Sequence, residues 1–446
     1  MRKIFLILFL VLLICTCNIT SAKTTNNSIE NIISNSRIDM SQIAISVKDA
    51  DSGKVVYAIN ESMLIPPASV QKMLTIIPIA ASLGLDYKYT TKLYSKNNNT
   101  EYLIKLGADP YLKTNDLKKL VKNILPSVRK ICIDDSIVEN KDWGEGWQWD
   151  DAFNPLMPRF NSYNLDNNII KLSLFPVDES SVIHVVNTTG YPLAIINNLS
   201  YGDDNSVKIS KENSLVDNMI KLEGKLNKQI SIYFPVDNLN RYFNIKLNKL
   251  LEERNIYLKD DFIVANVSED YTLIDEVAHS FSSGINDILK NSNNIVAETS
   301  LKLAGANSFG TVGTDKNGIK LFYNYCNSIG LDTSDIKITD ASGVSKNNLM
   351  NADFITEFLL KNKENEIYNT LPKPGEGTLA NRMITLKTNL RAKTGTLSNI
   401  SSIAGFLKTK AENNLVFCVM TNSPNASISD LKILEDYIIR ELYLKF

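Results

Sequence analysis

Histidine is scarce in this chain: among its 446 residues only His184 and His279 are of this type. The sequence contains no H-E-x-x-H string and no C-x-x-C pair, so the usual ligand patterns of a zinc peptidase are missing. A Ser-His-Asp triad is poorly supported as well, because only two histidines are available as its base. We therefore expect neither a metal nor another cofactor.

Cysteine is also sparse. Beyond the N-terminal segment only Cys132, Cys326 and Cys418 remain, scattered along the chain and odd in number. We predict that they are buried free thiols, with a disulfide as the open alternative.

An excess of charge of one sign is lacking too, because the net charge is −1. A nucleic-acid partner is not expected, since it would require a basic footprint. The chain is 44% apolar and 22% charged, which is ordinary for a globular protein that buries large cores.

The N-terminus holds an uncharged run from Ile4 to Cys17 that follows Met1-Arg-Lys3. This run is short for a membrane span, which needs about 20 apolar residues. With the small residues Thr20-Ser-Ala22 behind it, the segment predicts a signal peptide over residues 1–22. The mature protein would then be exported to the periplasmic or another extracytoplasmic cell-wall compartment. Lipidation at Cys15 or Cys17 and an uncleaved membrane anchor remain alternatives.

Three short motifs follow one another along the chain: Ser69-Val-Gln-Lys72, Ser292-Asn-Asn294 and Lys393-Thr-Gly-Thr396. They have the forms S-x-x-K, S-x-N and K-T-G, the active-site elements of penicillin-recognising serine acyltransferases. S-x-x-K by itself is weak evidence, because three other serine–lysine pairs fit it: Ser127/Lys130, Ser334/Lys337 and Ser429/Lys432. The information lies in the order, spacing and setting of the motifs.

Ser69 follows a predicted β-hairpin and precedes a predicted helix. The hairpin strands, the Pro-Pro stop and the helix are expected at Ile43–Val47, Val55–Ile59, Pro66-Pro67 and Met73–Leu83. At the first turn of this helix, Lys72 would lie on the same face as Ser69, close enough to share a proton. The alternative makes Ser69 a helix cap and Lys72 a solvated lysine. Pro78 predicts a kink within the helix.

The second motif is predicted to lie in a polar break between two helices, where Ser292 and Asn294 can face one cavity. The serine hydroxyl would relay a proton and the asparagine amide would pair with a substrate amide. The alternative is a simple helix-capping turn.

The third motif begins in a predicted strand that is followed by two β-rich runs, Ile403–Leu407 and Asn414–Met420. Gly395 would let a substrate backbone approach the strand, and Lys393, Thr394 and Thr396 would offer donors to a carboxylate. Alternatively, K-T-G is merely a strand-end turn.

With these motifs the chain resembles the low-molecular-mass class C penicillin-binding proteins, the D-alanyl-D-alanine carboxypeptidase/endopeptidase family. Further blocks strengthen this resemblance: Ala68–Thr75, Leu106–Pro110, Gly146–Asp151, Ser292–Glu298, Asp340–Ser345, and Gly375–Thr378 with Arg382. Two departures occur. The middle motif reads S-N-N where many relatives have S-D-N, and Asp340-Ala341 replaces a more usual Asp-Gly.

The resemblance implies an α+β penicillin-binding-protein/β-lactamase-like transpeptidase fold, an antiparallel sheet flanked by helices. Ser69 and Ser292 lie much farther apart than in a simple β-lactamase, which predicts a large insertion in the catalytic domain. We expect a discontinuous catalytic domain at 23–84 and 266–446 and a β-rich insertion at 85–265, in one or two subdomains. The amphipathic stretch Ile428–Phe446 is expected to close the catalytic sheet, with membrane contact as the alternative.

The resemblance also implies a mechanism, a serine-type D-Ala-D-Ala carboxypeptidase/endopeptidase reaction on peptidoglycan stem peptides that end in D-Ala-D-Xaa. Ser69 is the expected nucleophile, Lys72 its base and Ser292 the proton relay. Asn294, Lys393, Thr394, Gly395 and Thr396 bind the substrate, and β-lactams acylate Ser69. A non-catalytic cell-wall-binding homologue is one alternative. A β-lactamase is another, although no E-x-x-L-N string lies between Asn294 and Lys393.

The tryptophan-rich segment carries a conditional hypothesis. If it folds over the cleft, Asp150 or Asp151 grips the ammonium of a diaminopimelate side chain. The alternative places Trp147 and Trp149 in a core with the aspartates as caps.

Overall fold

The computed structural model describes residues 23–177, 182–211 and 218–446, so the predicted signal peptide lies outside the described residues. The chain divides into two compact units. Unit 1 comprises the residues up to Leu74 together with 329–337 and 348–446, and unit 2 comprises 75–328 and 338–347. The helices that flank the second motif belong to unit 2, together with the predicted insertion. The domain boundaries at 84/85 and 265/266 remain a prediction.

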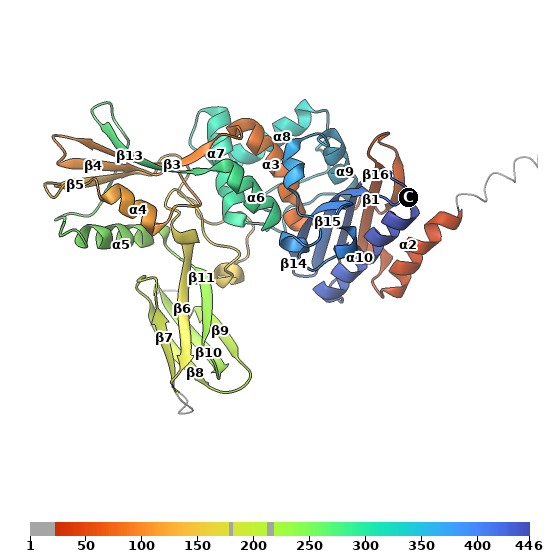
Figure 1. Cartoon of the computed structure of the whole chain (residues 1–446), viewed down its shortest axis with the longest axis horizontal. Coiled ribbons are helices and arrows are strands. Elements are labelled where there is room, and N and C mark those ends of the chain that lie inside the picture. Colours follow the sequence, from red (N-terminus) through yellow and green to blue (C-terminus); the bar gives the residue numbers. More distant parts are fainter. Residues whose placement is uncertain (1–22, 178–181, 212–217) are drawn as a thin grey trace, which may run out of the picture. The chain divides into compact units, whose positions relative to one another are not determined.

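Unit 1 is built on a five-stranded antiparallel sheet in the order β14-β15-β16-β1-β2 (Figure 1). Its strands are β1 (Ile43–Asp49), β2 (Val55–Ile59), β14 (Leu390–Leu397), β15 (Ile400–Lys408) and β16 (Asn414–Asn422). The predicted hairpin and the two β-rich runs after K-T-G are therefore confirmed. Strand β14, which carries K-T-G, lies at an edge of the sheet.

Helices cover both faces of this sheet, as the alternation of side chains along β1 requires. Helices α2 (Lys23–Asn35) and α10 (Ile428–Lys445) share one core with Ile45 and Val47. Helix α9 (Ala352–Lys361) covers the opposite face, where Thr356 hydrogen-bonds to Ser46 at 2.8 Å. The C-terminal helix thus packs on the five-stranded sheet, as predicted, with Leu431, Ile438 and Leu442 buried.

The described residues of unit 2 form three sheets. Their orders are β12-β5-β4-β3-β13, β11-β6-β7 and β8-β10-β9. The strands are β3 (Lys88–Lys96), β4 (Glu101–Lys105), β5 (Lys130–Asp134), β6 (Ile169–Pro176), β7 (Ile183–Asn187), β8 (Ala194–Tyr201), β9 (Ser206–Lys211), β10 (Met219–Leu226), β11 (Ile230–Pro235), β12 (Ile263–Val264) and β13 (Thr272–Ser280). Strands β3 to β12 lie within residues 85–265, the range of the predicted β-rich insertion, which itself remains a prediction.

The helices of unit 2 include two pairs that matter for the motifs. Helix α6 (Phe281–Lys290) ends just before the second motif, and α7 (Asn294–Phe309) begins inside it and packs on α8 (Asp315–Ser328). The remaining helices are α3 (Lys72–Leu83), whose first turn belongs to unit 1, α4 (Thr114–Val121) and α5 (Leu239–Glu252). Pro78 lies inside α3.

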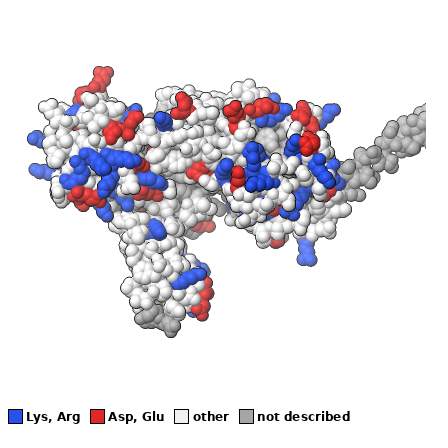
Figure 2. All heavy atoms as spheres, viewed as in Figure 1, with Lys and Arg blue, Asp and Glu red and all other residues white. Residues whose placement is uncertain are grey.

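The α+β fold prediction is confirmed. Cys132, Cys326 and Cys418 are buried free thiols, so the disulfide alternative is wrong. Among the described residues, none of the helices combines the length and the apolar character needed to cross a membrane. Figure 2 shows acidic and basic side chains side by side on the visible face, in keeping with the balanced charge.

Candidate active site

Ser69 lies in a short 3₁₀ turn, Ala68–Gln71, directly before α3. Ala68 has a φ of 50°, in the left-handed region that a residue with a Cβ adopts only at a cost of about 1 kcal/mol. Such backbone strain persists where surrounding packing holds it, and here the turn packs on β14 and β15. Ser69 therefore lies just before the helix, on a turn that packs against the sheet.

Lys72 is the partner of Ser69. Its Nζ lies 2.8 Å from Ser69 Oγ, within hydrogen-bonding distance, and the lysine side chain is fully buried. The alternative of a solvated lysine is therefore wrong. In the three other S-x-x-K strings the serine is exposed, and the lysine is not buried. The first motif thus differs from its chance copies in the burial of its lysine.

Lys393 lies on the same side of unit 1 as the turn. Strand alternation puts Lys393 and Gly395 on one face of β14, opposite Ala404 and Ser402 of β15. Burial, together with the positive charge of Lys72, lowers the pKa of Lys393 well below its ordinary value. The pair of lysines therefore loses a proton more easily than an isolated lysine does.

Gly395 is where the turn and the strand meet. A Cβ at this position would lie 2.3 Å from Ser402 Oγ, 2.8 Å from Ala68 Cβ and 2.9 Å from the Pro67 carbonyl oxygen. Ser402 in turn donates to the Pro67 carbonyl at 2.7 Å. The absence of a side chain at Gly395 thus lets the Ser69 turn sit on the strand.

The threonines of the third motif have different settings. Thr394 is buried and its hydroxyl donates to Thr378 Oγ1 at 2.8 Å, whereas Thr396 is exposed. Thr378 belongs to the Gly375–Thr378 block, to which the sequence assigned no role. Its signal was the block itself, but the contact joins residues 16 positions apart, which local periodicity does not pair.

The second motif lies in unit 2, in a break between α6 and α7 as predicted. Ser292 has a φ of 61°. The middle residue, Asn293, caps α7 by accepting from the Val296 N–H at 3.3 Å. Asn294 is the first residue of the helix, and its amide donates to the Leu156 carbonyl at 2.7 Å. The helix cap of the alternative interpretation is therefore present and is provided by Asn293, and the roles of Ser292 and Asn294 stay a prediction.

Further blocks meet in the core of unit 2. Glu298 is buried and accepts from the N–H groups of Ala341 and Ser342 at 3.1 and 2.8 Å. Asp340 accepts from the Trp147 indole at 2.9 Å and from the Ser345 N–H at 2.7 Å. Burial and the charge of Asp340 raise the pKa of Glu298 to about 8. These blocks form a buried polar network rather than surface loops.

The local turn after Asp340 tolerates the departure from Asp-Gly. Its left-handed residue is Gly343, with a φ of 78°, whose N–H donates to Asp340 Oδ1 at 2.8 Å. Ala341 instead uses its N–H to bind Glu298.

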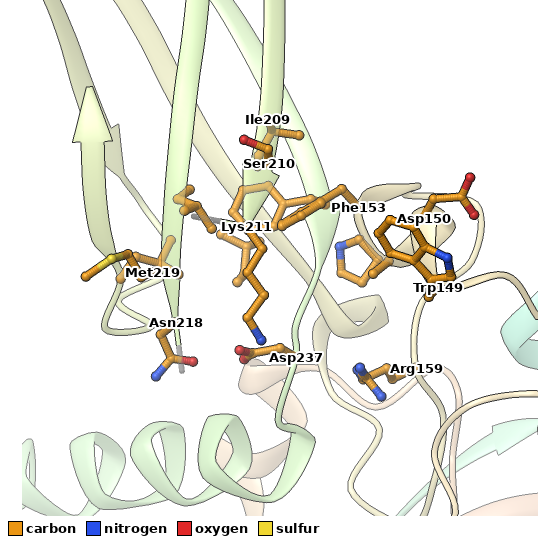
Figure 3. Close-up of a pocket in the computed structure, with 16 residues that line it drawn as sticks. Trp149, Asp150, Phe153, Arg159, Ile209, Ser210, Lys211, Asn218, Met219 and Asp237 are labelled. Carbon is orange, nitrogen blue, oxygen red and sulfur yellow. The ribbon is translucent and has the colours of Figure 1, made fainter. Parts of the chain in front are cut away.

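The tryptophan-rich segment lines a pocket of about 480 Å³ within unit 2 (Figure 3). Trp147 is buried, whereas Trp149 is 88% exposed, so the expectation of two core tryptophans holds for Trp147 alone. Trp149 and Asp150 stand at one side of the pocket, and Lys211 and Asp237 lie across from them. Apolar residues of β6, β9 and β10 form much of its remaining lining.

Comparison with solved structures defines the fold class. The crystal structure of penicillin binding protein 4 (dacB) from Haemophilus influenzae matches with a TM-score of 0.82, covering 94% of this chain and 99% of that one at 19% identity. A second structure of that protein, complexed with a β-lactam, matches with a TM-score of 0.78. The predicted penicillin-binding-protein fold is confirmed.

The family follows from the sequence comparison. Residues 25–439 match the D-Ala-D-Ala carboxypeptidase 3 (S13) family, and the chain belongs to this family. It is 24% identical over 418 residues to the D-alanyl-D-alanine carboxypeptidase DacB of Haemophilus influenzae, covering 86% of this chain and 85% of that protein. A D-alanyl-D-alanine carboxypeptidase of Actinomadura sp. strain R39 is also 24% identical, over 435 residues, with 88% and 80% covered.

Proposed function

We propose that this protein is a serine-type D-Ala-D-Ala carboxypeptidase and endopeptidase that acts on peptidoglycan through an acyl-enzyme at Ser69. The observation that carries the proposal is the 2.8 Å contact between Ser69 Oγ and the fully buried Lys72 Nζ. Membership of the S13 family supports the reaction class. The substrates are stem peptides that end in D-Ala-D-Xaa, and β-lactams act as their analogues.

In the first step Lys72 accepts the Ser69 proton, while Ser69 attacks the carbonyl carbon of the penultimate D-Ala. A carbon–oxygen bond forms, and the carbonyl electrons move to the oxyanion, which the N–H groups of Ser69 and Thr396 receive. Each such donor is typically worth about 3–4 kcal/mol in the transition state. Burial and the close approach of Lys72 and Lys393 disfavour two positive charges in the pair, and the mechanism assigns the neutral amine to Lys72.

The collapse of the tetrahedral intermediate breaks the peptide bond. Ser292 passes a proton to the leaving amine and is reprotonated by Lys72, which holds the proton taken from Ser69. Asn294 orients the substrate amide. Lys393, Thr394 and Thr396 hold the terminal carboxylate, while Gly395 keeps strand and turn close together. Water then attacks the acyl-enzyme and regenerates Ser69. A β-lactam keeps its leaving amine tethered near the ester, which hinders the approach of water and slows hydrolysis of the acyl-enzyme.

We further propose that the protein works outside the cytoplasm, where peptidoglycan lies, after removal of residues 1–22. This location is supported by the basic n-region and the following apolar run. The mass of the mature chain isolated from its host would decide among cleavage, lipidation and retention of the segment.

The testing experiment is labelling with a fluorescent penicillin, followed by a denaturing gel and peptide mapping. Wild type and Ser127→Ala, a serine of a chance S-x-x-K string, should both be labelled on Ser69. Ser69→Ala should remain folded and unlabelled. Lack of label on folded wild-type protein would overturn the proposal in favour of a wall-binding homologue. Rapid multiple turnover of a cephalosporin would instead indicate a β-lactamase.

A further inference from the structure

Asp287 near the end of α6 receives hydrogen bonds from both neighbours of Ser292. Its carboxylate Oδ1 accepts from the Asn291 amide at 2.8 Å, and Oδ2 accepts from the Asn293 amide at 2.7 Å. Its backbone carbonyl accepts from the N–H groups of the same two residues, at 3.1 and 3.2 Å. One residue thus holds the chain on either side of Ser292.

Ser292 needs such support because of its backbone. Its φ of 61° lies in the left-handed region, which costs a non-glycine residue about 1 kcal/mol or more. A strained conformation persists only where neighbouring contacts determine it. The four hydrogen bonds to Asp287 supply these contacts, and the N-cap that Asn293 provides to α7 adds a fifth on the far side.

We infer that Asp287 is a positioning residue for Ser292, and that it requires asparagine rather than aspartate at the centre of the motif. Asn293 uses both ends of its amide: the oxygen caps α7, and the nitrogen donates to Asp287. An aspartate at 293 would still cap the helix, but its second oxygen would face the Asp287 carboxylate without a proton between them. The S-N-N variant is thereby explained by its partner on α6.

Tyr111 from the predicted insertion is the third side chain that donates a hydrogen bond to the Asp287 carboxylate. Its hydroxyl donates to Asp287 Oδ2 at 3.2 Å. Burial, together with the charge of Asp287, raises the pKa of Tyr111, so its hydroxyl keeps the proton that it donates. The Tyr111 N–H is held by buried Asp109 at 2.9 Å, and Asp109 Oδ2 lies 2.6 Å from His279 Nδ1. The Leu106–Pro110 block thus supports the second motif through Tyr111.

The inference rests on the proposed function, because the effect on Ser292 is measured through acylation. The test is a cycle of Asn293→Asp, Asp287→Asn and the double variant, which restores the hydrogen bond with donor and acceptor exchanged. Asn286→Asp is the matched control. It adds the same charge next to Asp287 in sequence, at an exposed residue whose amide donates to the Ser282 carbonyl instead.

The rate constant of acylation by a fluorescent penicillin and the Tm are measured for every variant at a temperature where all are folded. Asn293→Asp should slow acylation about 10- to 100-fold, the effect of losing a charge-assisted hydrogen bond. The loss should appear in the acylation step rather than in reversible penicillin binding. The double variant should recover most of the rate and Tm, and Asn286→Asp should match wild type.

A rate for Asn293→Asp equal to wild type, or a double variant that merely multiplies the two single losses, would overturn the inference while leaving the proposed function intact. If wild type itself is not acylated, the proposed function fails. The Tm values of the two single variants and the double variant then test the Asp287–Asn293 hydrogen bond without the acylation rates. Recovery of Tm in the double variant then supports the Asp287–Asn293 pair, and additive losses of Tm refute it.

Discussion

Gly395 of β14 lies against Ala68 of the turn that carries Ser69, so closely that a Cβ on Gly395 would come within 2.8 Å of the Ala68 Cβ. This contact ties the first motif to the third within unit 1. The glycine of K-T-G was expected to admit a substrate backbone. In the structure it also has a role inside the protein, because the absence of a side chain lets the turn that carries Ser69 pack against the sheet.

We predict that Gly395→Ala displaces this turn. Overpacking of this kind costs about 1–3 kcal/mol, and acylation should fall by more than about 10-fold because Ser69 moves relative to Lys72. Thermal denaturation and penicillin acylation measure the two effects. Gly53→Ala is the control: Gly53 has a φ of 72° but open space around its Cβ position, so stability should fall without loss of acylation. Normal acylation in Gly395→Ala would contradict the packing argument.

The lysine pair predicts a pH dependence of acylation. The pKa of Lys393 is lowered by burial and by the charge of Lys72, so the pair carries two charges only at a pH below the usual lysine range. As the pH falls through that lowered pKa, the neutral amine disappears and the acylation rate constant should decrease. The check is the rate across pH 5 to 10, with Tm followed in parallel to separate unfolding from chemistry. A flat profile would refute this assignment.

Glu298 predicts a pH dependence of stability. Its pKa is raised to about 8 in the folded protein, above the ordinary value of 4.5, so the folded state binds the proton more tightly than the unfolded state. The corresponding stability is fully present below pH 4.5 and is lost as the pH rises to about 8. We expect the Tm of wild type to fall over this window more steeply than that of Glu298→Gln. Parallel curves for the two proteins would argue against the shift.

The two tryptophans of the Gly146–Asp151 segment offer a matched pair for stability. Trp147→Phe removes the indole donor to buried Asp340 and should lower the free energy of unfolding by about 1–3 kcal/mol. Trp149→Phe alters an exposed ring and should change it by about 0.5 kcal/mol or less. Denaturant unfolding of both variants tests the contrast, and equal losses would show that the indole hydrogen bond is not the cause.

The hypothesis that an aspartate grips a diaminopimelate ammonium remains a prediction. Asp150 lines the pocket of Figure 3 next to exposed Trp149. If Asp150 or Asp151 binds that ammonium, the double variant Asp150→Asn/Asp151→Asn should raise the KM for a cross-linked muropeptide several-fold and leave kcat nearly unchanged. Acylation by penicillin serves as the internal control, because penicillin has no diaminopimelate ammonium. Unchanged endopeptidase kinetics would remove the hypothesis.

Local signals in the sequence were enough to place the motifs on their elements. The hairpin before Ser69, the break at Ser292 and the edge strand at Lys393 each follow from periodicity and turn residues close by in the chain. Residues 85–265 were predicted to be β-rich, but strands such as β8 and β9 in this range, and β13 (Thr272–Ser280) beyond it, were not foreseen. Their exposed, polar sequences carry weak alternation, and their pairing depends on partners distant in the chain.

The sequence by itself determined the family, the α+β fold and the residue types of the chemistry, because these depend on motif order and on local patterns. The tertiary structure decided which atoms meet. It buried Lys72 and Lys393 close enough for the charge of Lys72 to lower the pKa of Lys393. It also fitted Gly395 against the turn that carries Ser69. It also joined Asp287 to Asn293, and Glu298 to the Asp340 turn. Most of these relations join segments distant in the chain, and Asp287 and Asn293, six positions apart, meet through the geometry of the break between α6 and α7. A linear pattern of residues carries no record of such packing distances.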